Sequence, residues 1–480
     1  MKAASPKVLA IGLDAADMAF FSAHRERLPA ISGFLDAAAV AELASEPMAG
    51  SVWPTFLSGV TPDRHGIYHH MQWDPARMAV RRTHPDWIEP QRPFWRDMAR
   101  EGCRVLVFDV PFAFRADTGG AQEIANWGSH DLVEDFWASD QALAREVQSA
   151  AREHPMGFEV PVYKSRDQLA AMAVPMAEGA RLKAELAARL LRESTPELCI
   201  IIFGEVHRGG HLLWPAPWSD APQDALLSVY AALDEAVATL LATASDDTDV
   251  VLFALHGMAA NQSQSHLSRA MLAAAETGGQ VQAKAPRDTG IVRLLRRTVP
   301  AGLQHWIADH VPRAVRDYVV RRDLSGGYDW ARTAAISLEG DVSGYWRLNV
   351  EGRERQGHLR PEAHRARVQS YAEAFEGFTT EEGNRLVQAV HFPALDGAGE
   401  QAWLLPDLLI EWNDDLPPLE SARHPALGRV TGRIATGRSG NHRFRGFVAH
   451  RGPGRETVPL PGHIKDLSRL LEALTERATQ

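Results

Sequence analysis

The chain has 480 residues, 45% of them hydrophobic and 23% charged, which is enough to bury one large core or two ordinary ones. A net charge of -10 excludes a general attraction to nucleic acid. No uninterrupted apolar stretch is long enough to span a bilayer, so no membrane partner is expected.

The two cysteines and the N-terminal residues indicate the cellular compartment of the protein. Cys103 and Cys199 lie in apolar, strand-like contexts, which predicts buried free thiols rather than a disulfide framework. Met1 to Pro6 carry no signal-peptide pattern. We therefore expect a soluble cytoplasmic protein.

A short apolar strand is predicted at the start of the chain, from Val8 to Leu13, and Asp14 follows it directly. A carboxylate at this point is either the N-cap of the next helix or a ligand at the active edge of an α/β sheet. Position alone leaves both readings open. A helix from Leu28 to Ala39 and a strand from Ala41 to Ala44 are predicted next.

Ser51 is the next candidate catalytic residue along the chain. Gly50 permits a tight turn before it, and Pro54 suits the first turn of a helix, so Ser51 is expected at a helix N-terminus. The helix dipole and the free N–H groups favour a bound anion there. Ser51 is therefore either a simple cap or, with a metal or base to lower its pKa, a nucleophile. Thr55 is a further candidate but lies inside the predicted helix.

The middle of the chain alternates between helices and strands. Predicted in order are a helix from Trp95 to Glu101, a strand from Arg104 to Val110, and helices from Gln141 to Glu153 and from Gln168 to Arg192.

Two histidines follow the next apolar strand, which runs from Leu198 to Phe203. If the turn after it is helical, His207 and His211 share one face of the helix. Neutral imidazole is a common ligand of zinc and similar ions. Such a pair lies more often on a surface or in a core than at a metal, so the assignment depends on the other strand ends.

A third histidine follows another predicted strand. After a long helix from Ala225 to Ala244, a strand runs from Asp249 to Ala254, and His256 comes just after its end. Residues 260–341 then interrupt the alternation. They are Arg-rich and helical, and we interpret them as an insertion or lid within the domain.

The last part of the chain adds strands and a fourth histidine. Strands are predicted from Gly344 to Val350, from Asp407 to Trp412 and from Gly446 to Ala449. His442 precedes the last of these and is expected in a loop beside it.

Alternating strands and helices over most of the chain predict an α/β fold, with a largely parallel, doubly wound sheet sandwiched by helices. We expect a single domain of residues 1–480 that includes the Arg-rich insertion. Ligands bind outside the carboxyl ends of the strands in such folds. This rule places Asp14, His207, His211 and His256 at one edge of the sheet.

The order of these motifs resembles the alkaline phosphatase superfamily, and most closely its branch of type I phosphodiesterases, nucleotide pyrophosphatases and related phosphohydrolases or phosphomutases. Gly12-Leu13-Asp14 matches the end of the first strand, and Ser58 to Gly66 matches a T-G-x-x-P-x-x-H-G segment. Trp330 to Thr333 and Asn349 to Glu354 match W-x-x-T and N-x-x-G-R-E features. The resemblance covers most of the chain.

This resemblance implies an alkaline phosphatase-like fold and a site with two metals, often zinc or manganese, that activate a nucleophilic oxygen for attack on phosphorus. It assigns the metal ligands to Asp14, His207, His211, His256 and His442, the nucleophile to Ser51 and a possible additional ligand to Glu205.

Three positions depart from the family pattern. His207 replaces an aspartate, Leu255 replaces another, and an ungapped match places Ala49 rather than Ser51 at the nucleophile. The first metal position would then hold three histidines and an open water site, as in catalytic zinc centres. The second would retain Asp14, His256 and Ser51, so one or two ions are expected.

We therefore expect a metal-dependent hydrolase of phosphate monoesters or diesters, using Ser51 or a metal-bound hydroxide to attack a small-molecule substrate. One alternative is a degenerate, non-enzymatic member that binds a ligand or a partner protein. Others are a phosphoryl transferase and a sulfatase-like enzyme of the same fold. The oligomeric state cannot be deduced from the sequence.

Overall fold

The computed structural model describes residues 5–83, 92–129, 134–150, 153–156, 165–222, 224–279, 328–338, 340, 342–434 and 437–477. Most of the predicted Arg-rich insertion, residues 280–327, lies outside the described residues. The insertion and the single-domain boundaries therefore stay predictions.

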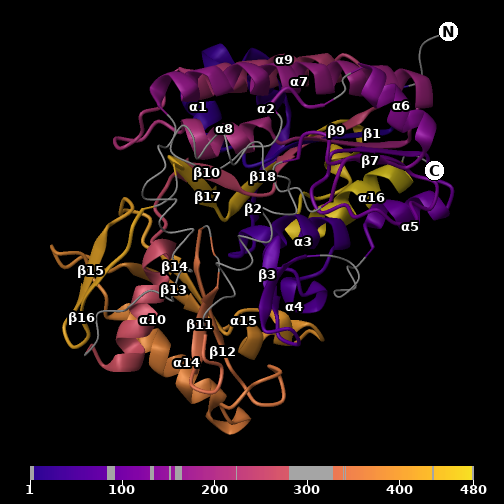
Figure 1. Ribbon diagram of the computed structural model, residues 1–480. Helices are drawn as coiled ribbons and strands as arrows, with labels where there is room; N and C mark the ends of the chain where they lie inside the picture. Colours follow the sequence, from indigo (N-terminus) through magenta and orange to yellow (C-terminus); the bar gives the residue numbers. More distant parts are fainter. Residues whose placement is uncertain are drawn as a thin grey trace.

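An eight-stranded sheet forms the centre of the upper part of Figure 1, in the order β2-β18-β9-β1-β8-β5-β6-β7. Its inner strands, from β9 to β6, pair in parallel, whereas β18 and β7 pair antiparallel with their neighbours. The predicted largely parallel α/β sheet is thereby confirmed. The strands are β1 (Val8–Leu13), β2 (Ala39–Ala44), β5 (Val105–Phe108), β6 (Gln122–Ala125), β7 (Trp137–Ala138), β8 (Leu198–Phe203), β9 (Asp249–Ala254) and β18 (Arg445–Arg451).

Helices cover both faces of this sheet because its central strands are apolar on both sides. In β1, Leu9, Ile11 and Leu13 belong to one core cluster, and Val8 and Ala10 to the opposite one. The first cluster includes α1 (Met18–Ala23), α2 (Pro29–Ala37), α6 (Gln141–Ala150), α7 (Arg166–Ser194), α8 (Glu205–Leu213) and α9 (Ala225–Leu241). The second includes α3 (Val52–Ser58), α5 (Phe94–Arg100) and α16 (Leu467–Arg477).

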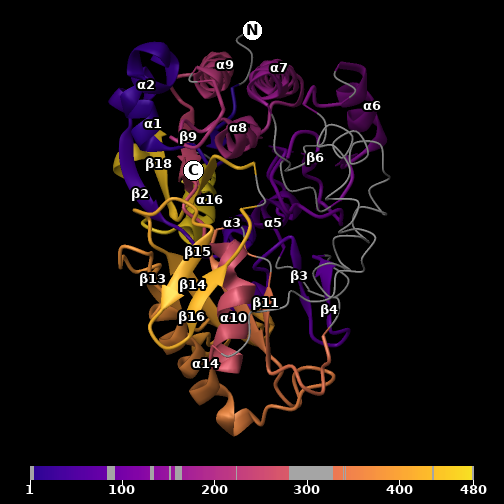
Figure 2. The same ribbon diagram turned by 60° about the vertical axis from the view of Figure 1, so that its left-hand side comes forward.

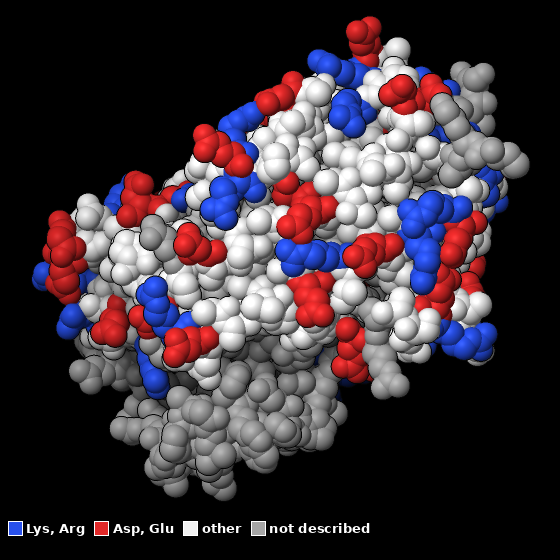
Figure 3. Space-filling view, turned by 90° about the horizontal axis from the view of Figure 1, so that it is seen from above, with Lys and Arg blue, Asp and Glu red and all other residues white. Residues whose placement is uncertain are grey.

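The outer surface seen from above Figure 1 interleaves acidic and basic side chains (Figure 3). An exposed pair of this kind joins the two long helices, where Arg181 on α7 contacts Glu235 on α9 at 2.5 Å. Surface pairs like this one contribute little stability, because water screens both charges.

A second, antiparallel sheet lies below the first (Figures 1 and 2), in the order β11-β12-β14-β13. Two of its strands are at predicted positions, but the sequence did not predict that they form a separate sheet with its own core. The strands are β11 (Ala335–Leu338), β12 (Gly344–Leu348), β13 (Val387–His391) and β14 (Leu408–Trp412). Helices α10 (Ser268–Thr277) and α14 (Pro361–Glu376) pack on one face. The hairpin of β3 (Met71–Asp74) and β4 (Ala79–Arg82) packs on the other.

The N-x-x-G-R-E segment, from Asn349 to Glu354, forms hydrogen bonds and ion pairs within this second sheet. The Arg353 guanidinium donates to both carboxylate oxygens of Asp407, at 2.6 and 2.7 Å, and Arg347 pairs with Glu354 at 2.7 Å. The Asn349 amide donates to the carbonyl oxygens of Trp330 and Thr333, each at 3.1 Å. These contacts tie the connection around β12 to the start of β14.

Among the described residues, no helix combines the length and apolar character that crossing a membrane requires. Both cysteines are free. Cys199 is buried as predicted, but Cys103 is partly exposed, which corrects the expectation that both are buried.

Candidate functional site

Two of the predicted ligands lie on α8, which begins directly after β8. His207 and His211 are one turn apart and share a face, as their spacing predicts. Their Nε2 atoms lie 3.0 Å apart, and both side chains are almost completely buried.

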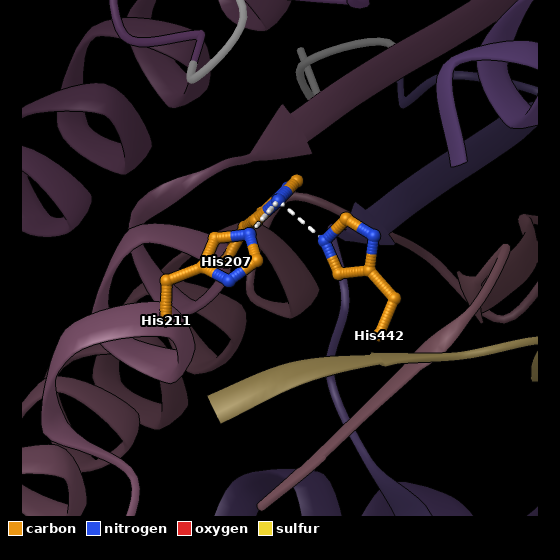
Figure 4. Close-up of side chains that lie close together, drawn as sticks. All are labelled: His207, His211 and His442. Atoms are coloured by element: carbon orange, nitrogen blue, oxygen red, sulfur yellow. Dashed lines mark hydrogen bonds between the residues drawn. The ribbon is translucent and has the colours of Figure 1, made fainter. Parts of the chain in front are cut away.

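His442 joins them from the far end of the chain. It lies on the short strand β17 (Gly440–Arg443), which corrects the prediction of a loop. This strand pairs antiparallel with β10 (Gly257–Ala260), and Met258 is the partner of His442. The Nε2 atoms of His442 and His207 are 2.8 Å apart (Figure 4).

His256 lies at the turn between β9 and β10, beside the same cluster. Its ring stacks on that of His442 with a centroid distance of 4.3 Å. The structure therefore brings together four histidines from three separate segments.

The hydrogen bonds of His207 and His211 determine which nitrogen of each ring faces the cluster. Nδ1 of His207 donates to Asp14 at 2.6 Å, and Nδ1 of His211 donates to the carbonyl oxygen of Gly440 at 3.0 Å, since neither acceptor can donate. In two neutral imidazoles, both Nε2 atoms then carry a lone pair. Two acceptors that face each other at 3.0 Å repel unless a proton or a metal ion lies between them.

The donor set fits a divalent metal ion. His207, His211 and His442 can each offer one nitrogen to a shared position, and Asp14, His207 and His256 form a second group with the same property. Three histidines with one open position form a recognised catalytic zinc site, and a carboxylate behind one of them is the usual support.

Asp14 is placed by the end of β1. Its backbone N–H donates to the carbonyl oxygen of Phe203 on β8 at 3.0 Å. The indole N–H of Trp53 donates to its Oδ1 at 3.1 Å. Asp14 is not the N-cap of α1, since Asp17 takes that role. The role of Trp53 has no sequence signal, because its partner is 39 positions away.

Ser51 lies at the start of α3, at the predicted helix N-terminus, and is completely buried. Its hydroxyl donates to the carbonyl oxygen of Met48 at 2.6 Å. Thr55 is engaged as well: Nδ1 of His65 accepts from the N–H of Ile67 at 3.0 Å, which leaves Nε2 of His65 to donate to Thr55 at 3.1 Å. His65, in the T-G-x-x-P-x-x-H-G segment, therefore links α3 to the turn that follows it.

Glu205 points into a different buried cluster rather than toward the histidines. Its Oε1 lies 3.1 Å from Nε2 of His154 and 3.3 Å from Nζ of Lys183, which also pairs with Asp109 at 2.8 Å. Burial alone raises the pKa of Glu205, but Lys183 and His154 outweigh this effect and hold it at about 2. Glu205 thus anchors the first turn of α8 instead of extending the ligand set.

A cleft of about 890 Å³ lies next to His442, which is the least buried of the three clustered histidines. Residues from both sheets line it, including Asp17, His391, Glu411, Trp412 and Arg443. His391 pairs with Glu411 at 2.6 Å, and Arg443 pairs with Asp414. The cleft therefore presents polar groups of both signs.

Comparison with known families gives one match. The model for type I phosphodiesterase / nucleotide pyrophosphatase matches residues 8–359. No curated protein matches this chain.

Solved structures of similar fold cover nearly the whole chain. Phosphonoacetate hydrolase from Sinorhizobium meliloti, in complex with phosphonoformate, has 15% identity and a TM-score of 0.51, over 99% of this chain and 96% of that one. Murine ectonucleotide pyrophosphatase / phosphodiesterase 5, in complex with AMP, has 12% identity and a TM-score of 0.48, over 98% and 95%. The first agrees with the α/β architecture described above.

Proposed function

This chain belongs to the type I phosphodiesterase / nucleotide pyrophosphatase family of phosphoester hydrolases, and we propose that it is a metal-dependent member acting on small-molecule phosphate esters. The observation that carries the metal dependence is the convergence of Nε2 atoms at His207, His211 and His442. Zinc is the first candidate ion, because imidazole nitrogen suits it, and manganese is the second.

A bound ion would neutralise phosphoryl oxygens and lower the pKa of an attacking hydroxyl or water. The three histidines would hold it. Asp14 and His256 form the second group of candidate ligands, as the resemblance implies. His207, His211 and His256 are buried, whereas His442 also lines the cleft, so we expect substrate to approach the ion from the side of His442.

Ser51 and a water molecule are the two candidate nucleophiles. Ser51 stands at a helix N-terminus, where N–H groups favour an anionic phosphoryl group. To attack, its hydroxyl would have to leave the Met48 carbonyl that it now contacts. Water entering from the cleft has no such contact to break.

The cleft favours a small substrate. Its volume accommodates a small-molecule ester, and its side chains can hydrogen-bond to the organic part. The family includes nucleotide pyrophosphatases, and phosphonoacetate hydrolase has a similar fold, so nucleotide esters and phosphonoacetate belong in the substrate panel beside chromogenic mono- and diesters.

The test is turnover after removal and return of the metal. Protein stripped with a chelator is assayed with 4-nitrophenyl phosphate, bis(4-nitrophenyl) phosphate, phosphonoacetate and AMP esters, and again after zinc or manganese is added. The proposal requires turnover that returns with metal in the native chain and in His424→Ala, but not in His211→Ala. His424 lies on the distant hairpin strand β15 (Ser421–His424) and controls for loss of any histidine. Turnover that is independent of metal would refute the proposal.

A further inference from the structure

Asp14 has two well-defined hydrogen-bond partners. Its Oδ2 accepts the Nδ1 proton of His207 at 2.6 Å, and its Oδ1 accepts the indole N–H of Trp53 at 3.1 Å. Indole nitrogen can only donate, so Trp53 requires an acceptor at this position. Both carboxylate oxygens are thus turned toward N–H donors of the protein.

The contact between Asp14 and His207 also determines how His207 can bind a metal. A neutral imidazole has one nitrogen with a proton and one with a lone pair. Because Nδ1 keeps its proton and donates a hydrogen bond to Asp14, only Nε2 can bind an ion, and Nε2 points toward His211 and His442. His207 therefore belongs to the three-histidine position and not to the group of Asp14 and His256.

We propose that this site holds a single metal ion on His207, His211 and His442, and that Asp14 is a positioning residue that orients His207 rather than a ligand. This inference rests on the proposed metal-dependent function and specifies its centre. It departs from the two-ion site that the resemblance implies.

The surroundings of His256 agree with this assignment. Its ring stacks on His442, and its Nε2 lies 3.7 Å from Oδ1 of Asp14, so no hydrogen bond to Asp14 orients His256 as it orients His207. The neighbouring Leu255 is buried in the apolar cluster, and its side chain offers no ligand atom. Within the part of the chain that the structure describes, a second ion at this position would find the His256 imidazole beside a carboxylate that already accepts two N–H groups.

The hydrogen bond to His207 explains how Asp14 can affect metal affinity without binding the ion itself. A carboxylate behind a metal-bound histidine fixes the ring and its tautomer, and losing it typically weakens metal affinity about 10- to 100-fold. Here the carboxylate is itself held by Trp53 and by the backbone contact to Phe203. Residues of β1, α3 and β8 thus orient one imidazole.

The experiment counts zinc per chain by elemental mass spectrometry and measures zinc affinity by chelator competition, with Co(II) absorption as a report on coordination. The chains compared are the native chain, Asp14→Asn, His256→Ala, and the matched control Asp140→Asn. Asp140 is an exposed carboxylate at the start of α6, outside the cleft, and one of its oxygens accepts from the backbone N–H groups of Ala142 and Leu143. Asparagine can accept both of these hydrogen bonds through its amide oxygen. Circular dichroism and thermal melting of the metal-free forms control for folding.

We expect about one ion per native chain, and about one in His256→Ala, since His256 is outside the ligand set. Asp14→Asn should still bind one ion, with affinity reduced about 10- to 100-fold, whereas Asp140→Asn should match the native chain. The Co(II) spectrum of Asp14→Asn should keep its tetrahedral character.

Two ions per native chain, with one lost in His256→Ala, would overturn the inference while leaving the proposed function intact. Unchanged affinity in Asp14→Asn would overturn the positioning role. No bound ion in any chain would overturn both this inference and the metal dependence. The count on the native chain requires no variant, so it remains decisive if Asp14→Asn does not fold.

Discussion

The Nε2 atoms of His207 and His442 lie 2.8 Å apart, although the two residues are separated by 235 positions in the chain. His442 reaches this position because β17 pairs with β10 and because the Gly440 carbonyl oxygen accepts from His211. The candidate site therefore depends on how closely a two-stranded ribbon approaches α8.

Gly440 makes that approach possible, so Gly440→Ala should move β17 away from α8. A Cβ at this position would lie 2.1 Å from the carbonyl oxygen of Gly210 on α8 and 2.8 Å from Cβ of Trp214. We expect about 1–3 kcal/mol of destabilisation from overpacking, together with weaker zinc binding. Gly33→Ala is the control, because nothing lies near a Cβ there. Equal zinc affinity in both variants would show that β17 tolerates displacement.

Lys183→Met should be strongly destabilising. Lys183 is completely buried and pairs with both Asp109 and Glu205, so its loss leaves two carboxylates without their cation. Removing one partner of a buried pair costs about 3–5 kcal/mol. Chemical denaturation measures this directly. Arg181→Met, on the same helix but in an exposed pair, should cost less than about 1 kcal/mol. Similar losses in the two variants would contradict this account of the cluster.

Glu46 should make the protein less stable as pH rises. Burial, with a smaller contribution from Asp63, raises the pKa of its carboxyl from 4.5 to about 7. The unfolded chain loses this proton near pH 4.5 and the folded chain near pH 7, so stability falls between these values. The linked change is at most about 3 kcal/mol.

Glu46→Gln should remove this slope. Its free energy of unfolding in urea should exceed that of the native chain by more at pH 8 than at pH 5. Glu42→Gln, at an exposed position on β2, is the control. Parallel curves for Glu46→Gln and the native chain would show that Glu46 titrates normally.

Ser51→Ala distinguishes the two nucleophiles. If Ser51 attacks phosphorus, turnover should fall by several orders of magnitude, because the covalent route is lost. Metal content should be unchanged, since the proposed ion is held by His207, His211 and His442. Turnover close to that of the native chain would exclude Ser51 and favour attack by water.

Much of the first sheet was predictable because its central strands are continuous apolar runs. The predicted bounds of β1, β8 and β9 agree with the structure, and the polar residues after them lie at one edge. The second sheet was not predictable in this way. Its strands are short and antiparallel, and β11 is separated from β10 by a long intervening segment.

Two details of the site depend on where α8 begins and on which strand pairs with β17. Residues two apart on a helix point in opposite directions, so Glu205 and His207 at the start of α8 cannot share a face. His442 was expected in a loop because it precedes the predicted strand from Gly446 to Ala449. It forms a strand because β10 offers a partner there, and such long-range pairing leaves no mark on the local sequence.

The central claim is that this hydrolase depends on a metal ion held by three histidines. The most direct test is a zinc titration of metal-free protein, with hydrolysis of a chromogenic phosphate ester followed at each addition. The account predicts no turnover without metal, and a rise that ends at about one equivalent in the native chain. It predicts no rise in His442→Ala. Full turnover in the metal-free protein, or an equal rise in His442→Ala, would contradict it.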